Sequence, residues 1–446
     1  MNKSKIHLDP PKVLVLGFLT VILIGAVLLT LPIATEDQKG LSFLNALFTS
    51  TSATCVTGLV VVDTGDTFSL FGELVILILI QIGGLGFMTF ATLIFLLLGK
   101  KISLKERLVL KEAFNNLSLA GVVQLVRRLF IFTALFEIAG GLILGIRFSF
   151  DMPIGKAFYY GFFHAISNFN NAGFDLMGEF RSLTPYVEDP IVVLTVCSLI
   201  TIGGLGFIVL NELFDYRKTH RLSVHTKIVL MTTLILTTGS TILIFIFEFG
   251  NPKTLGPLSE IGKVLGSLYQ AVTPRTAGSN TLPIGDLTHS TLFLITFLMF
   301  IGGGSGSTAG GIKITTFAVL LATVWSQIKG KEDVVLFKRR IVTETILKSM
   351  TVAVSGMSIV IVITMMLSIT ERQGLDFMYY LFEAASAFGT VGLSMGLTPE
   401  LSSIGRILIV FTMFAGRLGP LTVAFAIAKR RNPDAFRHPK GNIMIG

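Results

Sequence analysis

The sequence predicts an all-α polytopic membrane protein, with eight transmembrane helices arranged as four parallel helix–pore-loop–helix repeats around one pore. Hydrophobic residues make up 52% of its 446 residues and charged residues only 14%, against ~25% charged in soluble domains. Two glycine motifs recur four times in a fixed order. Eight apolar runs are long enough to cross a bilayer core of ~30 Å, and they lie at 13–33, 74–98, 129–149, 190–213, 228–249, 290–322, 350–370 and 404–428.

The basic residues predict the orientation of these spans. Of 36 lysines and arginines, 25 fall in five segments, at 1–12, 100–128, 217–227, 329–348 and 429–440. These segments alternate with sparsely basic ones, so the positive-inside rule places both termini in the cytoplasm. The net charge of +9 therefore reports multi-pass topology in a plasma membrane, and nucleic acid is not expected as a partner. The first span lacks a cleavage site and is expected to be retained.

Four stretches between the odd and even spans resemble one another. Their cores read LFTSTSATCVTGL, FHAISNFNNAGFD, SLYQAVTPRTAGSN and FEAASAFGTVGLS, which aligns Gly58, Gly173, Gly278 and Gly392 at intervals of 105 to 115 residues. A second motif follows in each even span, as IGGLGF, IGGLGF, IGGGSG and AGRLGP. Recurrence of this kind indicates an internal repeat. The expected units are an N-terminus at 1–12, repeat 1 at 13–98, repeat 2 at 99–213, repeat 3 at 214–322, repeat 4 at 323–430 and a tail at 431–446. Repeat 2 is expected to begin with an amphipathic helix, 100–128, on the inner face in contact with membrane lipid.

Each repeat is expected to contain a short re-entrant helix followed by a glycine loop. Non-helical backbone at membrane depth is tolerated where it lines a cavity or is buried in protein. The short helices, at 42–53, 155–168, 258–270 and 376–388, would point their negative ends at one axis, which favours a cation. Glycine lets the following loops turn their carbonyls inward, where a ring of oxygens can replace the water shell of an ion such as potassium. The expected selectivity filter comprises Thr54, Cys55, Val56, Thr57 and Gly58, then Asn170, Asn171, Ala172 and Gly173, then Thr276, Ala277 and Gly278, and finally Thr390, Val391 and Gly392.

The sixth span is expected to be interrupted. Six glycines lie within 302–311, and each disfavours helix by up to ~1 kcal/mol relative to alanine. A flexible intramembrane loop below the filter is the preferred interpretation, and close helix packing through small residues is the alternative. A phosphate-binding role is weak, because no strand precedes the glycines. The segment comprises Gly302, Gly303, Gly304, Ser305, Gly306, Ser307, Thr308, Gly310 and Gly311, followed by Lys313 at its inner end, and its hydroxyl groups are expected to meet water or the ion.

Arg417 lies deep within the eighth span, where an arginine costs at least ~2.5–3.5 kcal/mol. In the repeat alignment it takes the place of Gly84, Gly204 and Gly303. We expect it to face the pore opposite the glycine break, held by carbonyls of 302–311, so that its charge opposes cation passage. Loop 302–311 and Arg417 together form a candidate gate.

Other polar residues are expected to support the loops. Arg275 is expected to pair with an acidic residue behind the third loop, and Asn168, Asn170 and Asn171 to brace the second by hydrogen bonds. Cys55 and Cys197 lack metal-ligand spacing, and no transition-metal site is expected. Acidic residues on the predicted outer side are candidates for attracting cations to the pore mouth, although most such residues are simply solvated, and they are Asp63, Asp66, Glu73, Glu179, Glu188, Asp189, Glu248 and Asp286.

The loops TCVTGL, NNAGFD, PRTAGS and GTVGLS, with the GGLG motifs, the broken sixth span and the arginine in the eighth, resemble the Trk/Ktr/HKT superfamily of potassium transporters over about residues 13–430. The resemblance implies bacterial potassium uptake, a homodimer with one pore per subunit, and control by a cytosolic, KtrA-like ring of nucleotide-binding subunits that opens the 302–311 gate. In plant relatives a serine in the first loop accompanies sodium transport, so Gly58 favours potassium. Sodium as a coupling or activating ion is left open, and no covalent cofactor is expected.

Two other classes of protein fit the sequence less well. A sodium-coupled secondary transporter with alternating access would be expected to show inverted repeats or two matched helix breaks, whereas this sequence indicates parallel repeats and one strong break. A membrane-embedded enzyme would need a catalytic cluster such as HExxH or paired carboxylates within a span, and none is present.

Overall fold

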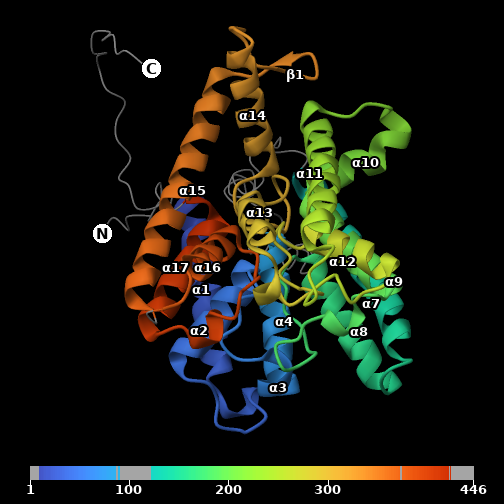
Figure 1. Cartoon of the computed structure of the whole chain (residues 1–446), viewed down its shortest axis with the longest axis vertical. Helices are drawn as coiled ribbons and strands as arrows, with labels where there is room; N and C mark the ends of the chain where they lie inside the picture. The colour runs from blue at the N-terminus through green and yellow to red at the C-terminus, as the bar shows by residue number, and fades with distance from the viewer. Residues whose placement is uncertain (1–9, 87–88, 91–121, 372–373, 421, 423–446) are drawn as a thin grey trace, which may run out of the picture.

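The computed structural model describes residues 10–86, 89–90, 122–371, 374–420 and 422. Figure 1 shows an assembly of helices with a small hairpin, β1 (Val335–Leu336) and β2 (Arg339–Arg340), at one end and the short helix α3 (Thr64–Thr67) at the other. Of the predicted surface helix, residues 100–121 lie outside the described residues, and 122–128 form the start of a long helix. Most of both predicted termini also lies outside the described residues.

Within the described residues, four helices are long and apolar enough to cross a membrane, or five if one sharply bent pair counts as a single span. They coincide with the predicted spans 13–33, 129–149, 228–249 and 350–370. Only 22–39% of the residues in their apolar windows are buried, so these helices form the outer layer. They are α1 (Pro10–Leu29), α7 (Val122–Phe148), α11 (Val224–Glu248) and α15 (Thr343–Thr370).

A short helix follows each long one, as predicted from the sequence. The short helices are α2 (Phe43–Cys55), α8 (Ile154–Phe169), α12 (Glu260–Val272) and α16 (Phe377–Gly389). They form the centre of the molecule, because large buried side chains such as Phe48, Phe163, Tyr269 and Phe382 belong to them. Their length of 13–16 residues is too short to span a bilayer core.

A second helix completes each unit and ends at the glycine motif. These helices are α4 (Leu70–Leu85), α9 (Pro190–Leu205), α13 (His289–Phe300) and α17 (Ser403–Leu418). Each begins at a polar residue whose side chain accepts a backbone N–H, namely Ser69, Asp189, Thr288 and Ser402. Such capping satisfies amide groups that the first turn leaves unpaired.

The predicted span at 190–213 is wrong as a continuous helix. After Gly206, whose φ is +98°, the chain turns by 97° into α10 (Phe207–Thr219). After Phe300 the helix stops and resumes only at α14 (Ile314–Ile328). The sixth span is therefore interrupted as predicted, but the sequence analysis missed the sharp bend in the fourth. The predicted number of eight spans is not confirmed.

The four units contact one another in cyclic order. Each short helix packs against the second helix of the preceding unit, since α8 contacts α4, α12 contacts α9 and α16 contacts α13. The ring closes because α2 of the first unit contacts α17 of the last. Three short 3-10 helices, η2 (Thr184–Tyr186), η3 (Ile284–Asp286) and η4 (Thr398–Glu400), precede α9, α13 and α17, while η1 (Pro32–Ala34) follows α1.

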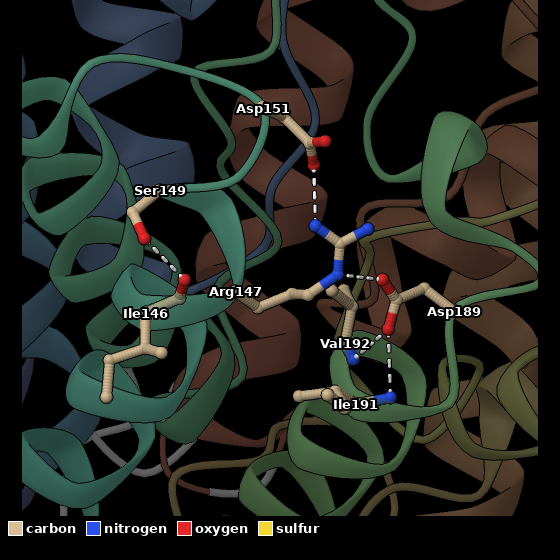
Figure 2. A network of polar contacts seen from close by, with 7 residues as sticks. All are labelled: Ile146, Arg147, Ser149, Asp151, Asp189, Ile191 and Val192. Atoms are coloured by element: carbon tan, nitrogen blue, oxygen red, sulfur yellow. Dashed lines mark hydrogen bonds and ion pairs between the residues drawn. The ribbon is translucent and has the colours of Figure 1, made fainter.

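In three of the four units, polar contacts tie the end of the long helix to the start of the second helix. In the second unit, Arg147 at the end of α7 binds both Asp151, at 2.8 Å, and Asp189, the N-cap of α9 (Figure 2). Asp189 also accepts the amides of Ile191 and Val192 at 2.9 and 3.1 Å. In the last two units a buried glutamate makes the corresponding contact. Glu248 accepts hydrogen bonds from Thr288, the N-cap of α13, and Glu371 accepts them from Ser402, the N-cap of α17.

Candidate functional site

The four predicted loop glycines meet in a closed ring. Each has a left-handed backbone, with φ of +87° at Gly58, +71° at Gly173, +81° at Gly278 and +95° at Gly392. A Cβ built on any of them would lie 2.2–2.5 Å from a carbonyl oxygen of the next loop. Those oxygens belong in order to Ala172, Ala277, Val391 and Thr57. Side chains are therefore excluded at these positions both by conformation and by space.

A second left-handed residue precedes each glycine by two positions. Val56, Asn171, Thr276 and Thr390 have φ between +50° and +75°. Residues with a Cβ adopt this conformation at a cost of about 1–3 kcal/mol each. The repetition at four equivalent positions gives all four loops a similar backbone conformation. Fourteen of the fifteen predicted filter residues are buried around the ring, and Gly392 is half-buried.

Serines that the sequence analysis missed hold the loops in this course. Ser52 Oγ accepts the amide of Gly58, and Ser386 Oγ accepts that of Gly392, both at 3.1 Å. Ser167 donates to the carbonyl of Phe174 at 2.6 Å. The signal was present in the aligned cores, because a serine stands six residues before the glycine in three of the four.

The asparagines of the second loop brace it, as expected. Asn168 Oδ1 accepts from Ser279 Oγ at 2.6 Å, which joins the second and third loops. Asn171 and the hydroxyl of Thr276 lie 3.2 Å apart in the same region. Arg275 behaves differently from its prediction: it is 7% exposed, its Nε has no hydrogen-bond partner, and no described acidic residue forms an ion pair with it.

A cavity of about 610 Å³ opens on one side of the ring and is lined by all four glycines. Its carboxylates are Asp63, Asp175 and Glu400, and Arg181 also lines it. Of the predicted mouth residues only Asp63 lines this cavity. Glu73 and Glu248 are instead buried, where they bind Tyr159 and the Thr288 cap, and Asp189 pairs with Arg147.

Asp175 is a second acidic residue at this cavity that the sequence analysis missed. It lies two residues beyond Gly173 and is half-buried. Burial, reinforced by the nearby Asp63 carboxylate, raises the pKa of Asp175 to about 6, although the amide of Met177 and the hydroxyl of Ser182 act in the opposite direction.

The carbonyl ends of three short helices pack closely against the first glycine of the glycine motifs. A Cβ on Gly83 would lie 1.9 Å from the carbonyl oxygen of Thr54, one on Gly203 2.0 Å from that of Phe169, and one on Gly416 2.0 Å from that of Phe388. The first glycine of the motif is therefore needed for close backbone approach. In the third unit the loop itself takes this place, since Gly302 faces the carbonyl of Gly310.

The 302–311 segment lies against the inner ends of the other units. The amide of Gly304 donates to Gly204 at 2.8 Å, and the amide of Phe207 donates to Gly306 at 3.0 Å. A Cβ on Gly310 would lie 2.0 Å from the hydroxyl of Thr390 at the base of the fourth loop. The segment is thus bonded to the second unit and packed beneath the fourth.

The hydroxyl groups of this segment bind protein rather than open space. Ser307 donates to Gly304 at 2.6 Å, Thr308 to Phe169 at 3.3 Å, and Ser305 lies 3.3 Å from the hydroxyl of Thr315. Contact of these groups with water or the ion stays a prediction. Lys313 folds back so that its Nζ donates to the carbonyl of Ala309 at 2.7 Å.

Arg417 is held by backbone carbonyls, as predicted. Its guanidinium donates to Thr308 in the 302–311 segment and to Gly83 and Gly84, the latter two at 2.5 and 3.3 Å. Gly83 and Gly84 lie in the last turn of α4, where helix carbonyls carry partial negative charge. The positive charge is therefore stabilised by a helix end instead of a carboxylate.

The chain is similar in sequence and in fold to known cation transport proteins. A sequence model of the TrkH family, described as cation transport protein, matches residues 12–438. The Ktr system potassium uptake protein B of Bacillus subtilis is 48% identical over 441 residues, covering 99% of this chain and 98% of the relative. The potassium/sodium uptake protein NtpJ of Enterococcus hirae is 39% identical over 446 residues, covering 99% and 98%. The crystal structure of the potassium transporter TrkH from Vibrio parahaemolyticus superimposes with a TM-score of 0.76 at 18% identity, over 96% of this chain and 86% of that one.

Proposed function

Because the chain belongs to the TrkH family of cation transport proteins, we propose that it is the membrane subunit of a Ktr-type system that takes up potassium through a channel-like pore. The relatives are named as potassium or potassium/sodium uptake proteins. The observation that carries the proposal is the closed ring of four left-handed glycines, each packed on a carbonyl of the next loop.

The filter acts through main-chain oxygens. The carbonyls of 54–58, 170–173, 276–278 and 390–392 replace the water shell of the ion, and the short helices direct their negative ends at it. The acidic cavity collects cations before they enter the ring.

The 302–311 segment and Arg417 form the gate below the filter. The segment packs beneath Thr390, and Arg417 fastens it to the end of α4. In this closed arrangement a positive charge lies on the inner side of the filter and opposes the passage of cations. Release of the Arg417 contacts frees the segment to move.

The complete assembly includes further components. We propose a homodimer with one pore per subunit, which lies in the bacterial plasma membrane in contact with lipid. Both termini of each subunit lie in the cytoplasm. A cytosolic nucleotide-binding ring docks on the basic inner surface and controls the gate. Sodium acts as a second ion, either coupled or activating, a proposal prompted by the name of the Enterococcus relative.

A sodium-coupled secondary transporter with alternating access is the alternative. The bend at Gly206 adds a second broken helix, so the count of breaks no longer argues against it. The shared cavity of about 610 Å³ does argue against this alternative, because the loops after all four short helices line it. The four units therefore point the same way, whereas inverted repeats would open to opposite sides.

Growth at low potassium tests the proposal. Cells without their own potassium uptake should be rescued by this chain expressed with its regulatory subunit. Gly58→Ser should impair rescue or shift uptake toward sodium, because its Cβ meets the Ala172 carbonyl at 2.4 Å. Gly155→Ser is the matched control, since a Cβ there meets no atom within 4 Å. Unchanged uptake and ion preference in Gly58→Ser would refute the filter assignment, and absence of rescue by the wild-type chain would refute potassium uptake.

A further inference from the structure

A buried carboxylate stands behind the second filter loop. Glu137 lies near the middle of α7, a helix that crosses the membrane, and is 8% exposed. No lysine, arginine or histidine in the described part of the chain forms an ion pair with it. An ionisable residue at this depth is costly and points to a functional role.

Three side chains form a closed triangle around this carboxylate. Asn170 Nδ2 donates to Glu137 Oε1 at 2.9 Å and to Gln81 Oε1 at 2.7 Å. Gln81 Nε2 donates to Glu137 Oε2 at 3.1 Å. The triangle joins a filter residue to α7 of its own unit and to α4 of the preceding unit.

Asn170 is the member of this triangle that belongs to the second filter loop. It is the C-cap of α8 and directly precedes the left-handed Asn171. Its Oδ1 has no hydrogen-bond partner and packs on Gly84, where a Cβ would lie 2.1 Å away. The side chain is thus fixed on both sides, with its nitrogen toward the carboxylate and its oxygen toward α4.

We infer that Glu137, with Gln81, is a positioning residue that fixes the base of the second filter loop through Asn170 and thereby sets ion preference. The inference rests on the proposed function. Because Asn170 and Gln81 both donate to Glu137, residue 137 must present two acceptors and no donor, which a carboxylate does.

A glutamine at this position cannot satisfy the triangle. It presents one acceptor and one donor, so its nitrogen faces a donor of either Asn170 or Gln81. If the Gln81 amide rotates to accept from the new glutamine, its own nitrogen then faces Asn170 Nδ2, so two donors still face each other. Glu137→Gln therefore keeps the size of the side chain and loosens the loop base, where Asn170 Nδ2 keeps its contact with the carbonyl of Ile166 at 2.9 Å.

The experiment measures ion preference in purified, reconstituted protein with its regulatory subunit. Glu137→Gln should raise the half-saturating potassium concentration and lower preference for potassium over sodium by roughly tenfold, the scale of one hydrogen bond to a charged group. Glu371→Gln is the matched control, because Glu371 is 7% exposed and binds Ser402, the N-cap of α17, rather than a residue of the filter loops. It should leave both quantities unchanged.

Gln81→Met tests the inference without altering the buried charge. It removes one acceptor of Asn170 and one donor to Glu137 and should shift ion preference in the same direction by a smaller factor. Wild-type potassium and sodium affinities in a folded Glu137→Gln protein would overturn the inference, as would the same shift in Glu371→Gln. If Glu137→Gln does not fold, unchanged preference in Gln81→Met overturns it. Absence of potassium transport by the wild-type protein would instead refute the proposed function.

Discussion

Four of the eleven non-glycine residues with left-handed backbone in the described part of the chain lie in the four loops, at equivalent positions. Val56, Asn171, Thr276 and Thr390 hold left-handed backbone, although glycine would relieve strain of about 1–3 kcal/mol at each site. Three of the four are β-branched, the type least suited to this conformation. Buried helix ends and the serine contacts of the loops hold them in place, so loop geometry is maintained at the expense of stability.

Asp175 predicts an acid sensitivity of uptake. Because burial raises its pKa to about 6, the carboxylate is charged above pH 6 and becomes neutral as external pH falls through 6. Its attraction for cations at the mouth is lost in the same range. The half-saturating potassium concentration should rise about two- to fivefold between pH 7.5 and pH 5, the effect of one screened charge.

Asp175→Asn provides the control for this pH effect. The variant should show the acid value at both pH values, because its side chain does not titrate. A full pH effect in the variant would assign the sensitivity to another group.

Arg417→Ala should raise potassium flux in the absence of activating nucleotide. The substitution removes the contacts to Thr308, Gly83 and Gly84 and the positive charge below the filter. Flux through proteoliposomes lacking the regulatory subunit should increase severalfold. Arg406→Ala is a suitable control, since Arg406 binds Asn45 nearer the start of α17. Reduced flux in folded Arg417→Ala protein would favour a purely structural role.

At the scale of elements, the sixth span differs from its three counterparts by an inserted segment. In the other units the first glycine of the motif packs against a carbonyl oxygen at the end of a short helix. Gly302 instead packs against the carbonyl oxygen of Gly310. Deleting part of 303–310 should therefore remove the obstruction while α13 and α14 remain intact. Uptake should rise, and its dependence on the regulatory subunit should weaken.

An insertion of equal length provides the opposite test of the loop. Extra glycine and serine residues after Ser305 should keep the obstruction and leave regulated uptake closer to wild type. If the deletion left both flux and regulation unchanged, the segment would not be a gate.

The elements divide clearly into those that the sequence could and could not predict. The short helices were predicted within two residues because repeat alignment and apolar length agree, and the break after Phe300 because many glycines disfavour helix. The turn at Gly206 was missed because IGGLGF is identical in the first two repeats and surrounded by apolar residues. In the structure Gly206 has a φ of +98° and lies against the Ser305 carbonyl of the 302–311 segment, and no local pattern reports that contact.

Residues of the site divide in the same way. The four glycines and Arg417 were found by comparing repeats. Glu137 and Asp175 were missed because each occurs in one repeat alone, and Arg275 was assigned an acidic partner that the described residues do not provide. A contact made by a residue that occurs in only one repeat depends on tertiary packing. Comparison of the repeats in the sequence therefore does not reveal it.

At the scale of the whole molecule, the charge pattern predicts which end faces the cytoplasm. Lys253 lies in a loop near the cavity end and is 69% exposed at its side chain, whereas Lys338 lies in the hairpin at the other end. A membrane-impermeant maleimide applied to intact cells should label Lys253→Cys but not Lys338→Cys. The native Cys55 and Cys197 are buried and free, so background labelling should be low. The reverse pattern would invert the orientation.

The closed ring of glycines also constrains how the protein is made. Gly392 packs on the carbonyl of Thr57, and Arg417 reaches Gly83 across 334 residues of chain. During synthesis the first three loops enter the membrane with the fourth side of the ring missing. The ring of four loops therefore closes only after the fourth loop has been made, and a chain truncated before Gly392 would lack one of the four sides of the proposed pore.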